Sequence, residues 1–215
     1  MLPLSLGEPG HPLTILCIGA HSDDIEIGAG GTLLRVLAER PGSTVHWVVC
    51  SAVGDRAVEA RASAAAFAAD AAALHVTLHE FRESHFPLEW GAVKAALEML
   101  KAVEPDVVLT HHRGDEHQDH DVLARLAWNT FRDHVIMEFE IPKYEGDLGH
   151  PNTYVPLADA VARRKVALLL EHFGTQRSRR WFRAQTFEGL MAVRGVECNA
   201  PDGYAEAFHC RKLVL

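Results

Sequence analysis

Short apolar segments alternate with longer segments of helical character along this chain, and that alternation restricts the fold more than any other feature. Five segments are short, apolar and partly β-branched, as buried parallel strands are: residues 13–18, 44–51, 75–81, 106–110 and 135–141. Helices are predicted at residues 32–40, 55–74, 88–103, 119–131, 157–173 and 178–193, with a late strand at 205–214. This order predicts a mostly parallel sheet with helices on both faces, a Rossmann-like three-layer α/β sandwich.

The size of the chain predicts one domain over residues 1–215, because 215 residues fill a single core. The formal net charge of −8 argues against a nucleic-acid-binding protein, which needs a basic surface. No apolar run approaches the roughly 20 residues that span a bilayer, and residues 1–12 lack the pattern of a secretory signal. Cys17 and Cys50 lie inside apolar runs and are expected to be buried free thiols, so a cytoplasmic protein is predicted.

Two polar loops follow predicted strands, and they hold most of the residues that can do chemistry. The first is His21-Ser22-Asp23-Asp24, directly after the first strand, and the second covers residues 111–120, directly after the fourth. In doubly wound sheets these two strands are commonly neighbours, and ligands bind beyond the carboxyl ends of the strands. The two loops are therefore expected to meet at one edge of the sheet.

The residue types in these loops are those that a divalent metal such as zinc prefers, namely imidazoles and carboxylates. With Asp24 as a ligand, Asp23 beside it can act as the base for a metal-bound water, since a catalytic zinc keeps one open position. An alternative is that Asp23 or Asp24 only caps a helix. Fourteen histidines also make some clustering by chance expected. The coincidence of both clusters at neighbouring strand ends favours the metal site.

The motifs of the two loops resemble those of the PIG-L or LmbE-like N-acetylglucosamine deacetylases. The first motif is His21-Ser22-Asp23-Asp24 with the glycine-rich residues 28–31 behind it, and the second is His117-Gln118-Asp119-His120. A weaker likeness lies in residues 204–208, Tyr-Ala-Glu-Ala-Phe. The resemblance covers nearly the whole chain, and it implies hydrolysis of the N-acetyl group of an amino sugar by a metal-activated water.

The resemblance also implies a role for individual residues. It implies zinc, or another divalent metal, held by His21, Asp24 and His120, with Asp23 as the general base. It implies that His117 acts as general acid or stabilises the oxyanion, and that Asp119 orients it. Arg56 resembles a substrate-binding arginine. Glu83 stands where members often have an aspartate that binds sugar hydroxyls.

Three positions depart from the family pattern. Ser22 and Gln118 stand where proline is usual, so these loops are expected to be slightly less rigid. Asp115 stands where some members have a tyrosine, which leaves one oxyanion donor unaccounted for. No residue that matches a metal ligand is lost.

Two further features have competing interpretations. The glycines of residues 28–31 form only part of a dinucleotide-binding pattern, and close packing of a loop on a helix explains them better. The segment 161–183 carries one acid, Glu171, and seven basic residues: Arg163, Arg164, Lys165, Arg177, Arg179, Arg180 and Arg183. This excess is either a solvated helix face or a phosphate clamp, since guanidinium groups suit phosphate oxygens. A clamp predicts a phosphorylated or nucleotide-linked sugar as substrate.

Two other functions remain open from the residues alone. One is a metal-dependent amidase that acts on a non-sugar amide, and the other is a Rossmann-type nucleotide-binding module without catalysis. The intact set of acidic and histidine side chains argues against the second, because binding alone needs no base for a metal-bound water. Family resemblance makes a homo-oligomer plausible, and no nucleic acid or membrane partner is expected.

Overall fold

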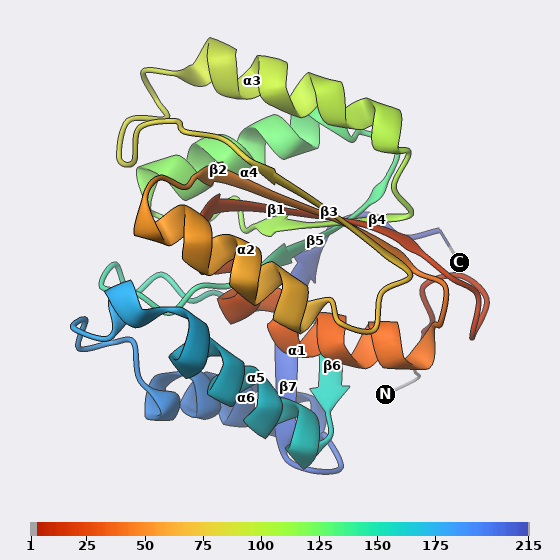
Figure 1. Cartoon of the computed structure of the whole chain (residues 1–215). Helices are drawn as coiled ribbons and strands as arrows, with labels where there is room; N and C mark the ends of the chain where they lie inside the picture. The colour runs from red at the N-terminus through yellow and green to blue at the C-terminus, as the bar shows by residue number, and fades with distance from the viewer. Residues whose placement is uncertain (1–3, 215) are drawn as a thin grey trace.

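A seven-stranded sheet flanked by helices forms the computed structural model, which describes residues 4–214 (Figure 1). The strands are β1 (Thr14–His21), β2 (Thr44–Ser51), β3 (Ala73–Leu78), β4 (Val107–His111), β5 (Val135–Phe139), β6 (Thr153–Leu157) and β7 (Tyr204–Cys210). The α-helices are α1 (Asp24–Glu39), α2 (Asp55–Phe67), α3 (Trp90–Met99), α4 (Gln118–Thr130), α5 (Asp159–His172) and α6 (Ala184–Cys198), with short 3-10 helices η1 (Leu100–Val103) and η2 (Gly174–Gln176). The predicted Rossmann-like α/β fold is confirmed.

The sheet is parallel over most of its width. Its strand order is β3-β2-β1-β4-β5-β7-β6, and the five strands from β3 to β5 are parallel to their neighbours. β7 runs antiparallel to both β5 and β6. Because β1 and β4 are adjacent, the loops that follow them lie at the same edge, as expected from the sequence.

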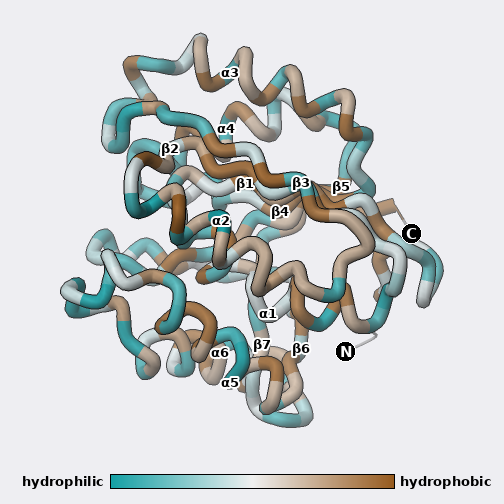
Figure 2. Tube along the Cα trace, in the orientation of Figure 1, coloured by the Kyte–Doolittle hydropathy of each residue, from teal (hydrophilic) through white to brown (hydrophobic). Residues whose placement is uncertain are grey.

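Each face of the sheet has its own apolar core. Along β1, Leu16 and Ile18 pack in the cluster with α3 and α4, whereas Ile15 and Cys17 pack in the cluster with α1, α2 and α5. This alternation follows from the two-residue period of a strand. Figure 1 shows the helices on the two sides of the sheet, and Figure 2 shows the apolar residues concentrated in the central strands between them.

The carboxyl-terminal third departs from the sequence prediction at one strand. Residues 153–157 form the edge strand β6, which was not predicted from the sequence. Pro156 lies within it, and proline disfavours a central strand but is tolerated at an edge, where one side of the backbone makes no ladder. Four of the five residues of β6 are only half-buried, so the apolar signal of a core strand is weak there.

Helix α1 begins at Asp24, eight residues earlier than predicted, and the glycines of residues 28–31 lie inside it. The prediction of a glycine-rich loop was therefore wrong, although close packing is indeed the reason for these residues. A Cβ on Gly30 would meet the ring of Phe67, and a Cβ on Gly31 would meet Leu157. Helix propensity disfavours glycine, but contacts from distant segments decide the outcome here.

Substitution of Gly28 by alanine is expected to destabilise the protein. Its Cβ would lie 2.7 Å from the Cβ of Phe139, an atom that cannot move without the backbone of β5. Overpacking of about 1–3 kcal/mol exceeds the roughly 1 kcal/mol that alanine gains over glycine in a helix. Thermal unfolding measures the change, with Gly189→Ala as control. Gly189 lies in α6 with no atom near its Cβ position, so Tm should stay equal or rise. Equal Tm values for Gly28→Ala and the wild type would contradict the packing argument.

All four cysteines are buried free thiols, which confirms the expectation for Cys17 and Cys50. Within residues 4–214, no helix has both the length and the apolar character that crossing a membrane requires.

Candidate functional site

Three buried side chains converge where β1 and α4 meet the start of α1. The Nδ1 atom of His21 lies 3.2 Å from Nε2 of His120 and 3.4 Å from Oδ2 of Asp24. His120 Nε2 lies 3.5 Å from the same oxygen. A tetrahedral metal with bonds of 2.0–2.1 Å separates its ligand atoms by about 3.3–3.4 Å. The three atoms therefore already have the spacing of metal ligands, and their donor types fit a zinc-like ion.

The other ring nitrogen of each histidine contacts a buried carboxylate. His21 Nε2 lies 3.2 Å from Oδ2 of Asp119, and His120 Nδ1 lies 2.9 Å from Oδ2 of Asp115. A histidine that donates one N–H to a carboxylate keeps the other nitrogen as a lone-pair donor, directed here toward the shared centre. The carboxylates therefore set which nitrogen of each ring is available for a metal.

Asp119 has a different partner from the one expected. Its carboxylate accepts hydrogen bonds from His21 and from the backbone N–H groups of Ser84 and Phe86. The expected partner, His117, meets only the backbone of Asp119, whose N–H donates to His117 Nδ1 at 3.3 Å. The sequence could not distinguish the two histidines, because both lie close to Asp119 once the chain folds.

Two further histidines surround the three converging atoms. Two overlapping sets place one possible ligand atom per residue within 4.8 Å of one another: His21, His117 and His120 in one, and Asp24, His111 and His120 in the other. His111 Nε2 also lies 3.0 Å from the backbone N–H of Ala20 and can accept its hydrogen bond. The sequence placed His111 in the second polar loop, but the family motifs assigned it no role. Together these side chains form a His/Asp cluster able to bind a metal ion: His21, Asp24, His111, His117 and His120.

Asp23 lies beside the cluster, at the start of α1. It occupies the N-cap position of α1 without a capping hydrogen bond from its side chain. Instead, Oδ1 accepts a hydrogen bond from Arg56 Nη2 at 2.9 Å. Burial raises the pKa of Asp23 to about 6, although the charge of Arg56 opposes the rise. A base with a pKa near neutrality suits proton transfer at physiological pH.

The two residues with expected substrate roles are also at this site. Arg56, in the first turn of α2, lies between Asp23 and Glu83, and its Nη1 is 3.7 Å from Glu83 Oε2. The side chain of Glu83 is 55% exposed, whereas that of Asp23 is 6% exposed. The Arg56 guanidinium therefore joins the buried cluster to the solvent-facing side of the site.

His117 is the N-cap residue of α4 and is only half-buried. Its ring centre lies 4.4 Å from that of His120 and 5.1 Å from that of His21. Burial and the nearby His21 lower the pKa of His117. Because Nδ1 accepts from the backbone, the neutral ring carries its proton on Nε2 and can donate it.

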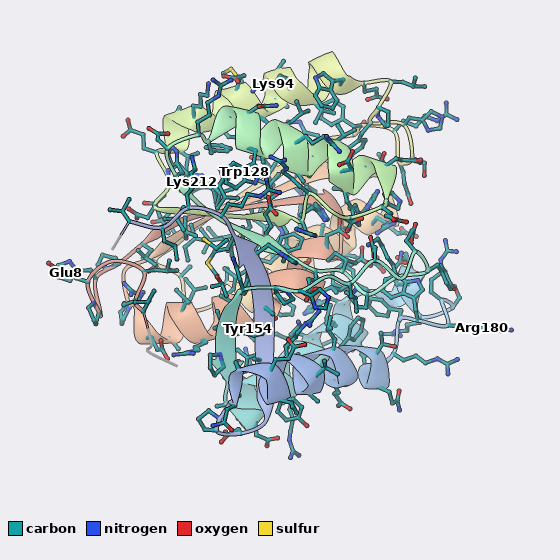
Figure 3. The ribbon with its side chains drawn as sticks, turned by 180° about the vertical axis from the view of Figure 1, so that it is seen from behind. Glu8, Lys94, Trp128, Tyr154, Arg180 and Lys212 are labelled. Carbon is teal, nitrogen blue, oxygen red and sulfur yellow. The ribbon has the colours of Figure 1, made fainter. Side chains whose placement is uncertain are left out.

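The basic segment divides into residues with different environments. Lys165 is buried and pairs with Glu206 at 2.6 Å, and Arg177 donates to the carbonyls of Leu170 and Glu171 at the end of α5. The side chains of the remaining basic residues near η2 make no ion pair or hydrogen bond with any residue from 4 to 214: Arg179, Arg180 and Arg183. Figure 3 shows Arg180 extended away from the body of the protein.

The same segment is anchored near the site. The backbone N–H of Thr175 and its hydroxyl donate to the carboxylate of Glu59, in the second turn of α2. Because α2 begins after β2, this contact places η2 at the carboxyl edge of the sheet. Exposed arginines at that edge are compatible with a role in binding an anion.

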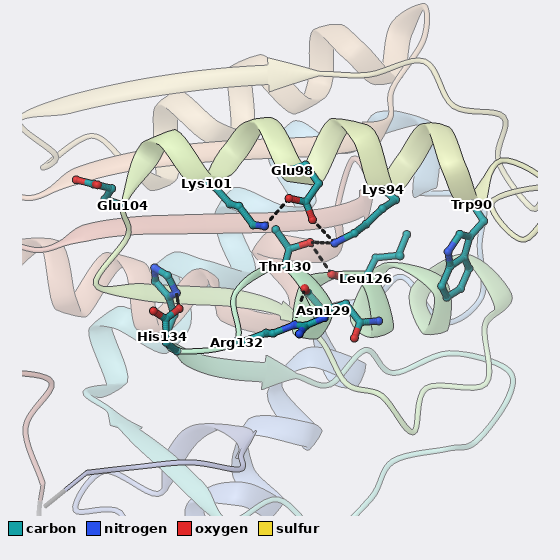
Figure 4. A pocket seen from close by; sticks show the side chains of 11 residues that line it. Trp90, Lys94, Glu98, Lys101, Glu104, Leu126, Asn129, Thr130, Arg132 and His134 are labelled. Atoms are coloured by element: carbon teal, nitrogen blue, oxygen red, sulfur yellow. Dashed lines mark hydrogen bonds and ion pairs between the residues drawn. The ribbon is translucent and has the colours of Figure 1, made fainter.

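A separate groove of about 1160 Å³ lies between α3 and α4 (Figure 4). It includes Lys94, Glu98 and Asn129, and Lys94 pairs with Glu98 and donates to Thr130. The rise of 1.5 Å per residue places Asn129 about 13 Å along α4 from His120. The groove is therefore not part of the His/Asp cluster.

Solved structures share the fold at low sequence identity. A conserved protein from Thermus thermophilus has a TM-score of 0.71 at 22% identity, over 94% of this chain and 96% of that chain. The N,N'-diacetylchitobiose deacetylase from Pyrococcus horikoshii has a TM-score of 0.70 at 18% identity, over 95% and 84%. GalB, the 4-carboxy-2-hydroxymuconate hydratase from Pseudomonas putida, has a TM-score of 0.72 at 18% identity, over 94% and 98%. No curated protein sequence matches the chain.

A protein-family model matches a continuous part of the sequence that contains both motifs and the residues between them. Residues 16–131 match PIG-L, described as GlcNAc-PI de-N-acetylase. The match covers more than half of the 215 residues and contains the whole His/Asp cluster together with Asp23, Arg56 and Glu83. This chain therefore belongs to the PIG-L family of de-N-acetylases.

Proposed function

We propose that this protein is a zinc-dependent hydrolase that removes the N-acetyl group from an amino sugar or its conjugate. The observation that carries the proposal is the convergence of His21 Nδ1, Asp24 Oδ2 and His120 Nε2 beside the buried carboxylate of Asp23. His21, Asp24 and His120 would hold the metal, because their spacing fits tetrahedral coordination. A zinc ion at this place supplies a Lewis acid for the acetyl carbonyl and lowers the pKa of a water molecule.

The residues around the metal would carry out the proton transfers and stabilise the developing charge. Asp23 accepts a proton from the attacking water, and Arg56 holds the Asp23 carboxylate in place through its 2.9 Å hydrogen bond. His117 donates a hydrogen bond from its Nε2–H to the acetyl oxygen as negative charge develops there. The C–N bond then breaks, and the departing amine receives a proton from Asp23 or from His117. Asp119 positions His21 through its carboxylate.

Substrate recognition would involve the solvent-facing part of the site. Glu83 offers a carboxylate that can accept hydrogen bonds from sugar hydroxyls, and Arg56 holds it near the cluster. The chitobiose deacetylase that shares the fold acts on an acetylated sugar, which agrees with this proposal. GalB carries the same fold and is a hydratase, so released acetate must be measured rather than inferred from the fold.

A substrate panel tests the proposed function. Acetate release should occur with N-acetylated sugars, their glycosides or their nucleotide conjugates, and it should require the metal. Protein purified without added zinc should contain about one divalent ion per chain. Release of acyl groups only from non-sugar amides would identify an amidase instead. Absence of both bound metal and acetate release would favour a binding module.

The exposed arginines near η2 lead to a separate prediction. If Arg179, Arg180 or Arg183 contacts an anionic part of the substrate, kcat/KM should favour a phosphorylated or nucleotide-linked N-acetyl sugar over its neutral analogue. A preference of ~1.5 kcal/mol or more, about tenfold, is expected for a hydrogen bond to a charged group, and it should shrink as salt rises. The triple alanine variant should lose the preference, whereas Arg163→Ala, which removes an exposed arginine paired with Asp159, should keep it. Equal kcat/KM for both substrates at low and high salt would leave the segment as a solvated surface.

A further inference from the structure

Asp115 is a buried carboxylate with three donors around it. Oδ2 accepts a hydrogen bond from His120 Nδ1 and forms an ion pair with Lys143 Nζ, each at 2.9 Å, and Oδ1 accepts from the backbone N–H of His117 at 2.9 Å. One carboxylate oxygen of Asp115 thus faces His120 while the other is fixed by the backbone of the second motif. Asp115 is therefore a fixed acceptor for His120.

Lys143 lies in the loop between β5 and β6, and its side chain is only 8% exposed. Its Nζ contacts both oxygens of Asp147, at 2.6 and 2.7 Å, in addition to Asp115 and the Ile141 carbonyl. An ammonium group has three protons, and three acceptor atoms of the protein lie within hydrogen-bond distance, with the Asp115 carboxylate as a further ion-pair partner. Lys143 therefore acts on its protein neighbours.

The same loop is attached to the second motif at another point. Asp147 Oδ2 accepts a hydrogen bond from the backbone N–H of Glu116 at 2.7 Å. Lys143 and Asp147 thus contact two consecutive residues of the segment that leads into α4, Asp115 and Glu116. His117 and His120 follow directly in the chain, so the β5–β6 loop helps to position both rings.

We propose that Lys143 is a positioning residue that orients His120 through Asp115, so that the β5–β6 loop forms part of the metal site. This inference rests on the proposed function, in which His120 is a metal ligand. Without the lysine, the Asp115 carboxylate would keep a buried charge with one partner fewer and would no longer be fixed in one orientation. His120 would then lose the fixed acceptor that keeps its proton on Nδ1 and its lone pair on Nε2.

The partner of His21 provides an internal contrast. The carboxylate of Asp119 is held by the backbone N–H groups of Ser84 and Phe86 and by no lysine or arginine among residues 4–214. Removal of Lys143 should therefore disturb His120 while it leaves the orientation of His21 unchanged. The expected defect is a weakened metal site and not a general loss of the fold.

The test measures zinc binding to the apoprotein, with zinc alone as the probe and a chromogenic chelator as competitor. Lys143→Met should weaken zinc affinity about tenfold or more, since loss of an outer partner of a metal ligand typically lowers affinity 10–100-fold. Lys143→Arg keeps the charge and should recover most of the affinity. Lys94→Met is the matched control, because Lys94 also pairs with a carboxylate but lies in the groove of Figure 4, away from the cluster.

Thermal unfolding of each protein without and with zinc distinguishes a weakened metal site from a general loss of stability. The proposal expects a smaller zinc-induced rise in Tm for Lys143→Met than for the wild type at equal zinc concentration. Lys143→Gln, which keeps a hydrogen-bond donor, is the second variant if Lys143→Met does not fold, and it should show an intermediate affinity. Equal zinc affinity in the wild type and a folded Lys143 variant would overturn this inference alone. A wild-type protein that binds no zinc would overturn the proposed function, and this inference with it.

Discussion

Replacement of Asp23 by asparagine is expected to lower kcat by about 10²–10⁴-fold while the metal content stays unchanged. Asparagine has nearly the same shape and can still accept the hydrogen bond from Arg56, which Asp23 Oδ1 accepts at 2.9 Å. It cannot accept a proton from water at neutral pH, so only the proposed base is removed. Steady-state kinetics on an acetylated sugar, together with elemental analysis of the purified variant, measure both quantities.

The control for this variant is Asp121→Asn. Asp121 lies on α4 beside His120 in the sequence, but among residues 4–214 its carboxylate pairs only with Arg125, one turn along the same helix. Its loss should leave both kcat and metal content near the wild-type values. Near-normal turnover of Asp23→Asn would remove Asp23 from the mechanism. Loss of metal from that variant would mean that Asp23, and not Asp24, is the ligand.

The variant His120→Ala is expected to lose both the metal and the activity. His120 Nε2 lies within 3.5 Å of both other proposed ligand atoms, and His120 belongs to both sets of side chains that could hold an ion. Loss of a direct ligand should weaken zinc affinity by more than the 10–100-fold that loss of an outer partner causes. Removal of zinc from the wild type by a chelator should likewise abolish acetate release, and added zinc should restore it.

Two other histidine variants show whether the ligand set is correct. His117→Ala should keep the metal and lose turnover, because we assign His117 to the substrate and not to the ion. His11→Ala removes a histidine that is exposed and pairs with Glu8, and it should change neither property. Metal loss in His117→Ala, with metal retained in His120→Ala, would shift the site to a different group of side chains.

The amino-acid sequence determined the order of the helices and strands, and it determined which polar residue types lie at the carboxyl edge of the sheet. Apolar runs such as those of β1 and β4 are local signals, because a buried strand needs consecutive residues that can all be covered. The chain order then places the ends of neighbouring strands side by side. For this reason the residue pattern alone was enough to expect the principal polar side chains at one edge of the sheet: His21, Asp23, Asp24, His117, Asp119 and His120.

Only the tertiary structure decided which atoms meet. Asp119 and His21 are 98 residues apart, and Lys165 and Glu206 are 41 residues apart, so no periodic pattern relates the members of either pair. Asp115, Lys143 and Asp147 read as ordinary charged residues of two loops, and the sequence carries no sign that they share one buried network.

The same reason explains the errors in the predicted elements. The three glycines within residues 28–31 of α1 are poor helix formers, but Phe67, Phe139 and Leu157 approach so closely that only glycine fits at these positions. Residues 153–157 are a weak strand sequence with a proline, but pairing with β7 makes them a strand. Helix propensity differs by at most about 0.7 kcal/mol per residue among ordinary residues and costs about 1 kcal/mol for glycine. Packing against distant segments outweighs it wherever the two disagree, and that packing exists only after the chain has folded.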